Sequence, residues 1–185
     1  MRFTTLLLDP PWPESGGGKV KRGADRHYPL MKVRDMPGVI LGSGLWTPAE
    51  HAHVWMWTTN TYLPGALWLL GQLGAAYRTN VAWVKDGRPG LGQYFRGKHE
   101  LLLFATFGNG KNPTVFSGRR DLPTVIVAAR GRHSAKPEAA YRLIEDRSVG
   151  YRVEFFARAA RPGWVSWGPH EGLAPAIDQK KAPVE

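Results

Sequence analysis

The sequence predicts an α/β fold in which helices cover both faces of one sheet. Short segments such as residues 3–8 and 100–107 are apolar throughout, which is typical of central strands that are buried on both faces. Segments with helical spacing alternate with these strands, around residues 63–74 and from Pro137 onward. The 185 residues also suffice for one domain with a full core. A layered α/β sheet therefore fits better than a β-sandwich.

The first half of the chain contains two strands and two helices. Residues 3–8 form an apolar strand that stops at Pro10 and Pro11, because neither proline has an N–H for a sheet. Residues 32–41 can form a short helix. Residues 51–59 are a second apolar strand, and residues 63–74 follow with leucines at helical spacing and glycines at the end.

The second half supplies the remaining strands. We expect strands at residues 79–85, 100–107 and 124–129, each apolar and separated by Gly-rich or basic loops. Pro137 suits the first turn of a helix, where Glu138 faces the positive end of the helix dipole. The last expected strands are residues 151–157 and 164–167.

Composition and processing signals suggest a globular intracellular protein. We expect one domain over residues 1–171 and a frayed tail over residues 172–185. No apolar run approaches the ~20 residues that span a bilayer, and Leu8 leads straight into Asp9 without a signal peptide. The chain has no cysteine, which excludes disulfides and thiolate metal sites and favours the cytoplasm. We expect no membrane contact and no metal.

Positive charge is concentrated in two regions. The net charge is +10; residues 19–34 hold six basic side chains against one acid, and residues 85–136 hold ten against three. Basic side chains in Gly-rich loops favour contact with a phosphate backbone, so nucleic acid is the expected partner. A basic, soluble surface is the alternative explanation.

Asp9-Pro10-Pro11-Trp12 presents an acid, rigid carbonyls and an indole just after a strand, where open α/β sheets place their chemistry. A nucleobase amine is a poor nucleophile because its lone pair is delocalised into the ring. The Asp9 carboxylate and the Pro10 carbonyl can accept its two N–H groups and localise that lone pair. Trp12 can stack on a flipped base, at about 1–3 kcal/mol. The alternative is a strand-ending proline turn followed by a core tryptophan.

The chain resembles the MT-A70 family of S-adenosylmethionine-dependent adenine-N6 methyltransferases, whose catalytic tetrapeptide Asp9 to Trp12 matches. The resemblance covers residues 4–171 and consists of motifs in a fixed order. After the tetrapeptide these are His27-Tyr28-Pro29-x-Met31, Trp57-Thr58-Thr59-Asn60, Trp83-Val84-Lys85, Arg96 with His99-Glu100, His133-Ser134-x-Lys136-Pro137-Glu138, Glu154-Phe155-Phe156-Ala157-Arg158, and Gly163-Trp164 with Trp167-Gly168.

The resemblance implies a Rossmann-like methyltransferase fold in permuted order, with the catalytic half first and the cofactor half last. It implies S-adenosyl-L-methionine as the methyl donor, and it assigns residues to three roles. The catalytic residues are Asp9, Pro10, Pro11 and Trp12. The cofactor-binding residues are Asp9, Lys136, Glu154, Arg158, Arg161 and His170. The substrate-binding residues are Tyr28, Lys85, Arg96 and His99.

Each assignment has an ordinary alternative. Lys136 could be a solvated side chain, and Glu154 with Arg158 a surface ion pair. The substrate-binding cations and histidine could be structural. The sequence also departs from the family where Pro169-His170-Glu171 replaces an expected Asn followed by Gln or Glu, and where only eight residues precede Asp9. At the first departure, either His170 or Glu171 substitutes for the missing side chain or the contact is absent. At the second, we expect another segment to cover the cofactor adenine.

The leading hypothesis is methylation of the N6 amine of adenine in nucleic acid, with DNA favoured over RNA because no added RNA-binding module is visible. The alternatives are an RNA adenine-N6 methyltransferase and a non-catalytic nucleic-acid-binding subunit, although such subunits typically lose the acid or the tryptophan of the tetrapeptide. Methylation of a protein amide is disfavoured by the order of the two halves. A homodimer is expected because a small domain with long loops often needs a second copy to grip its substrate.

Overall fold

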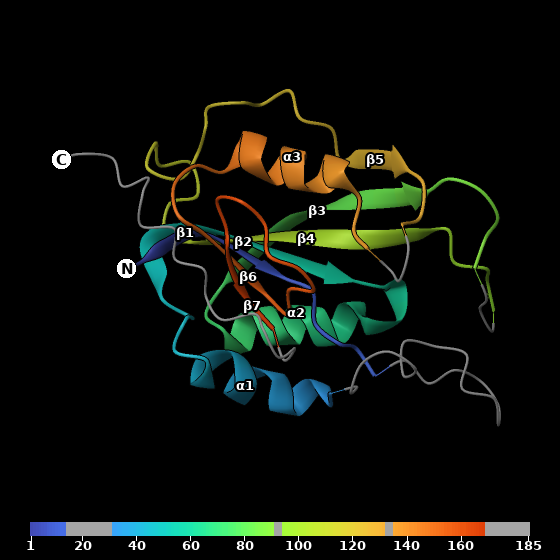
Figure 1. The fold of residues 1–185 in the computed structure, drawn as a ribbon, viewed down its shortest axis with the longest axis horizontal. Helices are drawn as coiled ribbons and strands as arrows, with labels where there is room; N and C mark the ends of the chain where they lie inside the picture. Colours follow the sequence, from blue (N-terminus) through green and yellow to red (C-terminus); the bar gives the residue numbers. More distant parts are fainter. Residues whose placement is uncertain (14–30, 91–93, 132–134, 169–185) are drawn as a thin grey trace.

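A computed structural model describes residues 1–13, 31–90, 94–131 and 135–168, which form a seven-stranded sheet covered by helices (Figure 1). The strand order is β5-β3-β4-β2-β1-β6-β7. The strands are β1 (Phe3–Leu8), β2 (Pro48–Thr58), β3 (Ala76–Lys85), β4 (His99–Phe107), β5 (Val125–Ala128), β6 (Arg152–Phe155) and β7 (Val165–Trp167). The helices are α1 (Met36–Gly42), α2 (Leu63–Gln72) and α3 (Glu138–Arg147), with short 3-10 turns η2 (Val33–Asp35) and η3 (Asn60–Tyr62) before the first two.

The side chains of β1 show why the sheet needs cover on both faces. Leu6 and Leu8 pack into the core under α1 and α2, while Leu7 packs into the core under α3. All three side chains are fully buried, as expected where successive residues point to opposite faces of a sheet. Figure 1 shows α3 on one face and α1 with α2 on the other. The predicted three-layer α/β architecture is confirmed.

Strand direction determines which residues meet at the functional edge. β1 is parallel to β2 and β6, β6 is parallel to β7, and β3 is parallel to β5. β4 is antiparallel to both of its neighbours, β2 and β3. The first residues of β4, His99 and Glu100, therefore lie at the edge where β1 ends and Asp9 follows. This mixed sheet is consistent with the predicted Rossmann-like methyltransferase fold.

The predicted elements correspond closely to those observed, with two instructive differences. The strand predicted at 151–157 ends earlier, at Phe155, because Phe156 has a φ of 62° and leaves the extended conformation. The helix predicted at 32–41 is divided into η2 and α1. The predicted tail, residues 172–185, lies outside the described residues. None of the described helices is long and apolar enough to cross a membrane.

A buried histidine joins β2 to the α3 side of the molecule. The two ring nitrogens of His53 lie 2.7 Å from Ser148 Oγ and 2.7 Å from the Gly110 carbonyl oxygen, and the side chain is fully buried. Burial lowers the pKa of His53 to about 4, more than the hydrogen bond to Gly110 raises it. His53 is therefore a neutral structural residue.

We predict that His53 makes stability depend on pH. The unfolded chain binds a proton near pH 6.5 and the folded protein only near pH 4, so the contribution of neutral His53 is complete above pH 6.5 and lost as the pH falls towards 4. The difference in unfolding free energy between the wild type and His53→Gln should shrink by roughly 3 kcal/mol over that range, measured by urea denaturation. A difference that stays constant with pH would contradict this role.

Candidate active site

Asp9 lies at the point where the chain connections of the sheet diverge. From β1 the chain continues to β2 on one side, and from β6 it continues to β7 on the other. In open α/β sheets, ligands bind at such a switch point, outside the carboxyl ends of the strands. The Asp9 N–H donates to the Phe155 carbonyl oxygen at 3.2 Å, which fixes the end of β1 against the end of β6.

A buried network of charges surrounds Asp9. Lys136 Nζ lies 3.0 Å from Asp9 Oδ1 and 3.1 Å from Glu100 Oε2. Lys85 forms a second ion pair with Glu100, and Arg158 Nη2 lies 3.5 Å from Asp9 Oδ2. The side chains of Asp9, Glu100 and Lys136 are only 9–12% exposed, so Lys136 is not the solvated residue of the alternative interpretation. We call these five residues the Lys136 network.

The pKa shifts of two members of the network, Lys136 and Glu100, favour their charged forms. Burial alone would lower the pKa of Lys136, but Asp9 and Glu100 outweigh it and the pKa is raised. Burial would raise the pKa of Glu100, but Lys136 and Lys85 outweigh it and the pKa is lowered. Lys136 Nζ also lies 5.3 Å from the centre of the Trp57 ring, a favourable cation–π distance. Three cations and two carboxylates leave the network with a net charge of +1.

Trp12 has a different place from the one predicted. Its side chain is 7% exposed, its ring stacks on Tyr62 with centres 5.7 Å apart, and its Nε1–H donates to the Trp57 carbonyl oxygen at 3.0 Å. We correct the prediction that Trp12 offers an open face to a flipped base, because the ring belongs to the core. Trp12 instead fixes the direction of the Pro10-Pro11 turn. The tetrapeptide thus combines a core tryptophan with an acid at the functional edge.

Glu154 is a second buried acid at this edge. Its Oε1 accepts a hydrogen bond from the Tyr141 hydroxyl at 2.8 Å, from α3. Burial raises the pKa of Glu154 to about 7, with a further increase from Asp9 and an opposing decrease from the Tyr141 hydrogen bond. Its register partner on β7 is Ser166, whose buried hydroxyl has no hydrogen-bond partner among the described residues. A carboxylate and an unpaired hydroxyl side by side suit a polar ligand.

The alternative explanation of Glu154 and Arg158, a surface ion pair between them, does not hold. Glu154 is buried against Tyr141, and Arg158 lies against Asp9. Arg161 donates to both carboxylate oxygens of Glu138, at 3.1 and 2.6 Å, and its guanidinium lies 3.6 Å from the centre of the Tyr141 ring. Arg161 therefore holds α3 beside Glu154.

The remaining predicted residues divide into three groups. Lys85 belongs to the Lys136 network, and His99 Nε2 lies 3.1 Å from Asn60 Oδ1 at the same edge. Arg96 is exposed in the loop before β4. Tyr28 and His170 lie outside the described residues, as does the Pro169 departure, so their roles stay predictions.

Two site residues had no predicted role. Glu100 appeared only as part of a motif, since nothing local shows that an antiparallel strand brings it to Asp9. Tyr141 lies on the predicted helix, where the sequence hypothesis assigns it no role. The sequence feature that could have identified Tyr141 is its position four residues after Pro137. This places it beside Ala140 and Ile144, on the helix face that packs on the sheet.

We predict that replacing Glu154 reveals its raised pKa. The folded pKa of about 7 lies above the ordinary 4.5, so stability from the protonated acid is complete below pH 4.5 and lost as the pH rises through 7. Relative to Glu154→Gln, the wild type should lose roughly 3 kcal/mol of unfolding free energy between pH 4.5 and 8. His53 acts with the opposite sign over a similar range, so each effect is measured against its own variant. An unchanged difference would contradict the assignment.

The arrangement can orient an amine beside a ligand that carries hydroxyl groups. Asp9 can accept from a substrate N–H, and the Pro10 carbonyl, which accepts from the Trp12 N–H at 2.9 Å, keeps a second lone pair. Glu154 Oε2 can accept from a diol, as acids in nucleotide sites do. Lys136 uses two of its three N–H donors on Asp9 and Glu100.

Comparison with known proteins gives a consistent result. The sequence model of the MT-A70 family matches residues 3–170. Two similar proteins are both described as "N6-methyladenosine RNA methyltransferase MTA1". The one from Cryphonectria parasitica is 29% identical and the one from Pyricularia oryzae 28% identical, each over 178 residues and 90% of this chain. These alignments cover 51% and 46% of the relatives, so the chain spans about half the length of the curated relatives it matches.

Proposed function

Because the chain belongs to the MT-A70 family, whose methyltransferases use S-adenosylmethionine, we propose that it methylates the N6 amine of adenine in RNA. The observation that carries this proposal is the position of Asp9 at the switch point, held by Lys136 and Arg158. The Asp9 carboxylate accepts a hydrogen bond from one N–H of the adenine amine, and the Pro10 carbonyl accepts one from the other N–H. Both contacts localise the nitrogen lone pair and orient it.

The cofactor supplies an activated methyl group on a sulfonium when it is bound. This chain offers Glu154 for ribose hydroxyls, and Lys136 and Arg158 for the carboxylate of the amino-acid portion. The buried Ser166 hydroxyl, unpaired among the described residues, supports a polar ligand here. Arg161 supports Glu154 through Tyr141. We keep His170 as a candidate for the adenine end.

RNA is preferred over DNA because both named relatives are described as RNA methyltransferases. This reverses the preference drawn from the sequence, where RNA was the alternative. The proposed partner is a single-stranded segment whose target base leaves its stack. We also propose that the protein is a homodimer, because a small domain with long basic loops often needs a second copy to bind its substrate. The proposed location is the cytoplasm.

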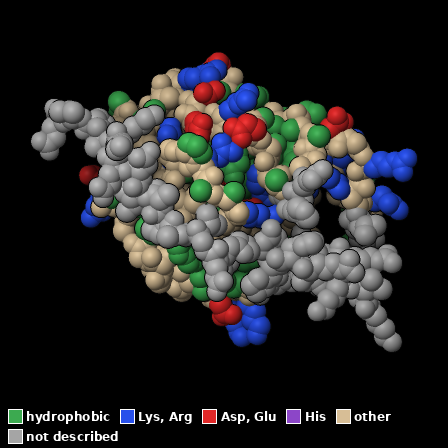
Figure 2. Space-filling model, viewed as in Figure 1, with side chains coloured by type: hydrophobic (Ala, Val, Ile, Leu, Met, Phe, Trp, Pro, Cys, Tyr) green, Lys and Arg blue, Asp and Glu red, His purple; other side chains and the backbone are tan. Residues whose placement is uncertain are grey.

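The edge of the sheet supports contact with a polyanion. Figure 2 shows Lys and Arg side chains gathered at the side where β3 and β5 end in Figure 1. In the loop before β4, Tyr94 and Phe95 are 91% and 90% exposed and precede Arg96. Consecutive exposed aromatic side chains beside cations suit stacking on unpaired bases. We propose that they contact bases next to the target adenine.

The proposed activity predicts N6-methyladenosine as the product. The protein is incubated with methyl-labelled S-adenosylmethionine and matched single-stranded RNA and DNA, which are then digested to nucleosides. Label should appear in N6-methyladenosine from RNA, and Asp9→Ala should reduce it by about 100-fold or more while the circular dichroism spectrum is kept. Asp35→Ala, an exposed acid at the start of α1, is the control.

Three outcomes would contradict the proposal. Label confined to DNA would reject RNA as the substrate. An active Asp9→Ala variant would remove Asp9 from its role. Oligonucleotide binding without any cofactor binding in calorimetry would favour the non-catalytic subunit.

The aromatic pair predicts a specific change in kinetics. Tyr94→Ala/Phe95→Ala should raise KM for an RNA oligonucleotide about tenfold or more and leave kcat nearly unchanged, because stacking is worth about 1–3 kcal/mol per base. Tyr77→Ala removes an exposed tyrosine on β3 and should have no such effect. Equal KM values for the double variant and the wild type would contradict base stacking by this pair.

A further inference from the structure

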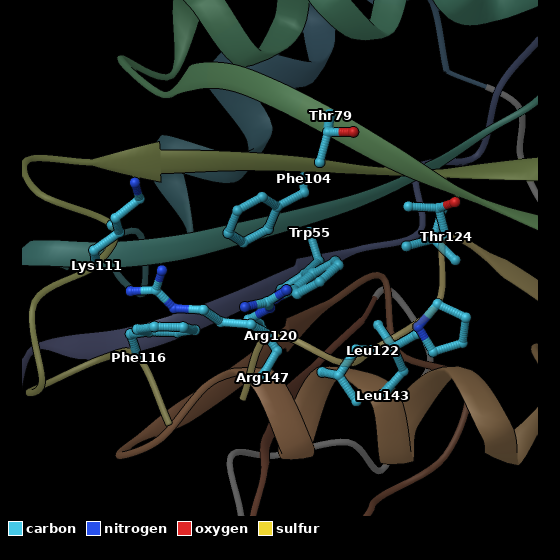
Figure 3. A pocket seen from close by; sticks show the side chains of 13 residues that line it. Trp55, Thr79, Phe104, Lys111, Phe116, Arg120, Leu122, Thr124, Leu143 and Arg147 are labelled. Atoms are coloured by element: carbon cyan, nitrogen blue, oxygen red, sulfur yellow. The ribbon is translucent and has the colours of Figure 1, made fainter. Parts of the chain in front are cut away.

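A cavity of about 260 Å³ lies between the sheet and α3, apart from the Lys136 network. Its floor is formed by Trp55, Val81 and Phe104, from the three adjacent strands β2, β3 and β4. Leu143 and Arg147 of α3 form one wall (Figure 3). No member of the Lys136 network lines it. Trp55 lies two residues, about 7 Å, along β2 from Trp57, whose ring contacts Lys136.

The cavity is positively charged. Lys111, Arg120 and Arg147 line it, and no acid does so among the described residues. The nearby acids Asp121 and Asp146 are both paired with Arg119, at 2.8 Å each. The cations therefore lack a compensating carboxylate within the cavity.

Two of these cations are available to a ligand. The side chains of Lys111 and Arg120 make no hydrogen bond or ion pair with any other residue in the described part of the chain. Arg147 donates to the Arg119 carbonyl oxygen at 2.6 Å and packs on Phe116 at 5.1 Å, which orients its guanidinium. Burial lowers the pKa of Arg147 more than Asp121 raises it, and Arg120 lowers it further. An anion bound between the two guanidinium groups would relieve that repulsion.

The rest of the cavity suits a planar ring with polar edges. Figure 3 shows Lys111 and Phe116 towards one end and Leu122, Leu143 and Thr124 towards the other, with Trp55 and Phe104 between them. The hydroxyls of Thr79 and Thr124 have no hydrogen-bond partner among the described residues. Hydroxyl groups beside aromatic and aliphatic side chains can pair with the edge of a nucleobase, which an alkyl chain does not offer. Paired guanidinium groups match a phosphate.

We propose that this cavity binds a nucleotide, with its phosphate at Lys111, Arg120 and Arg147 and its base against Phe104 and Leu122. The ligand is either a free nucleotide or one nucleotide of a nucleic-acid strand. Binding here does not depend on methyl transfer at Asp9.

The test uses probes that contain no adenine, so that they are not acceptors at Asp9. Uridine monophosphate and a hexamer of uridine are titrated into the full chain carrying Asp9→Ala. The readout is the NMR signal of the Trp55 indole N–H, which donates to Ser148 Oγ beside the cavity and is assigned with Trp55→Phe. A saturable shift with either probe is expected. A shift with the monophosphate identifies a free nucleotide as sufficient, and a shift with the hexamer alone identifies a strand; both support the proposal.

Matched variants locate the binding. Lys111→Ala/Arg120→Ala should weaken the affinity about tenfold or more, while Arg142→Ala, an exposed cation on α3 that does not line the cavity, should leave it unchanged. Both changes replace exposed side chains, so the fold should be kept. Laurate, which offers only an alkyl chain and a carboxylate, is titrated as the control ligand. The proposal is overturned if neither nucleotide probe shifts the Trp55 signal, if both variants lose the same affinity, or if laurate alone shifts the signal. Because Asp9→Ala is used throughout, these results are separate from the test of methyl transfer.

Discussion

The ion pairs of Lys136 hold together three parts of the sequence that lie far apart. Its ammonium group joins Asp9 after β1 to Glu100 at the start of β4, and Lys136 itself comes from the segment between β5 and α3. Without this cation, Asp9 and Glu100 would be neighbouring buried carboxylates with less compensating charge. Removing one partner of a buried ion pair costs about 3–5 kcal/mol, so the geometry of the acid depends on the network.

The sheet topology places this network next to a second buried acid, Glu154. β1 and β6 are parallel neighbours whose onward connections run to opposite sides of the switch point. Asp9 from the first half of the chain therefore lies near Glu154 from the last part. Phe156 has a φ of 62° directly after β6, a conformation that costs a non-glycine residue about 1–2 kcal/mol. Its ring packs on Trp167 at 5.5 Å, which helps to offset that cost. Local strain at this position is typical of a functional edge.

The sequence predicted the strands and the place of Asp9 because these depend on local properties. Apolar runs locate the strands, and Pro10 with Pro11 must end β1 wherever the chain goes next. The contact between Glu100 and Lys136 was not predictable in this way, because it depends on β4 running antiparallel. The burial of Trp12 depends on Tyr62, 50 positions away. A sequence pattern thus predicts which residues reach the edge, whereas packing decides which of them face a ligand.

The central claim, that Lys136 and Asp9 act as a unit, is tested most directly by a double-mutant cycle. Unfolding free energies are measured by urea denaturation for the wild type, Asp9→Asn, Lys136→Met and the double variant at one pH. The account predicts a coupling energy of about 1–3 kcal/mol between the two positions, because each residue stabilises the buried charge of the other. Effects that add within about 0.3 kcal/mol would show that the two side chains do not interact, and would contradict the account.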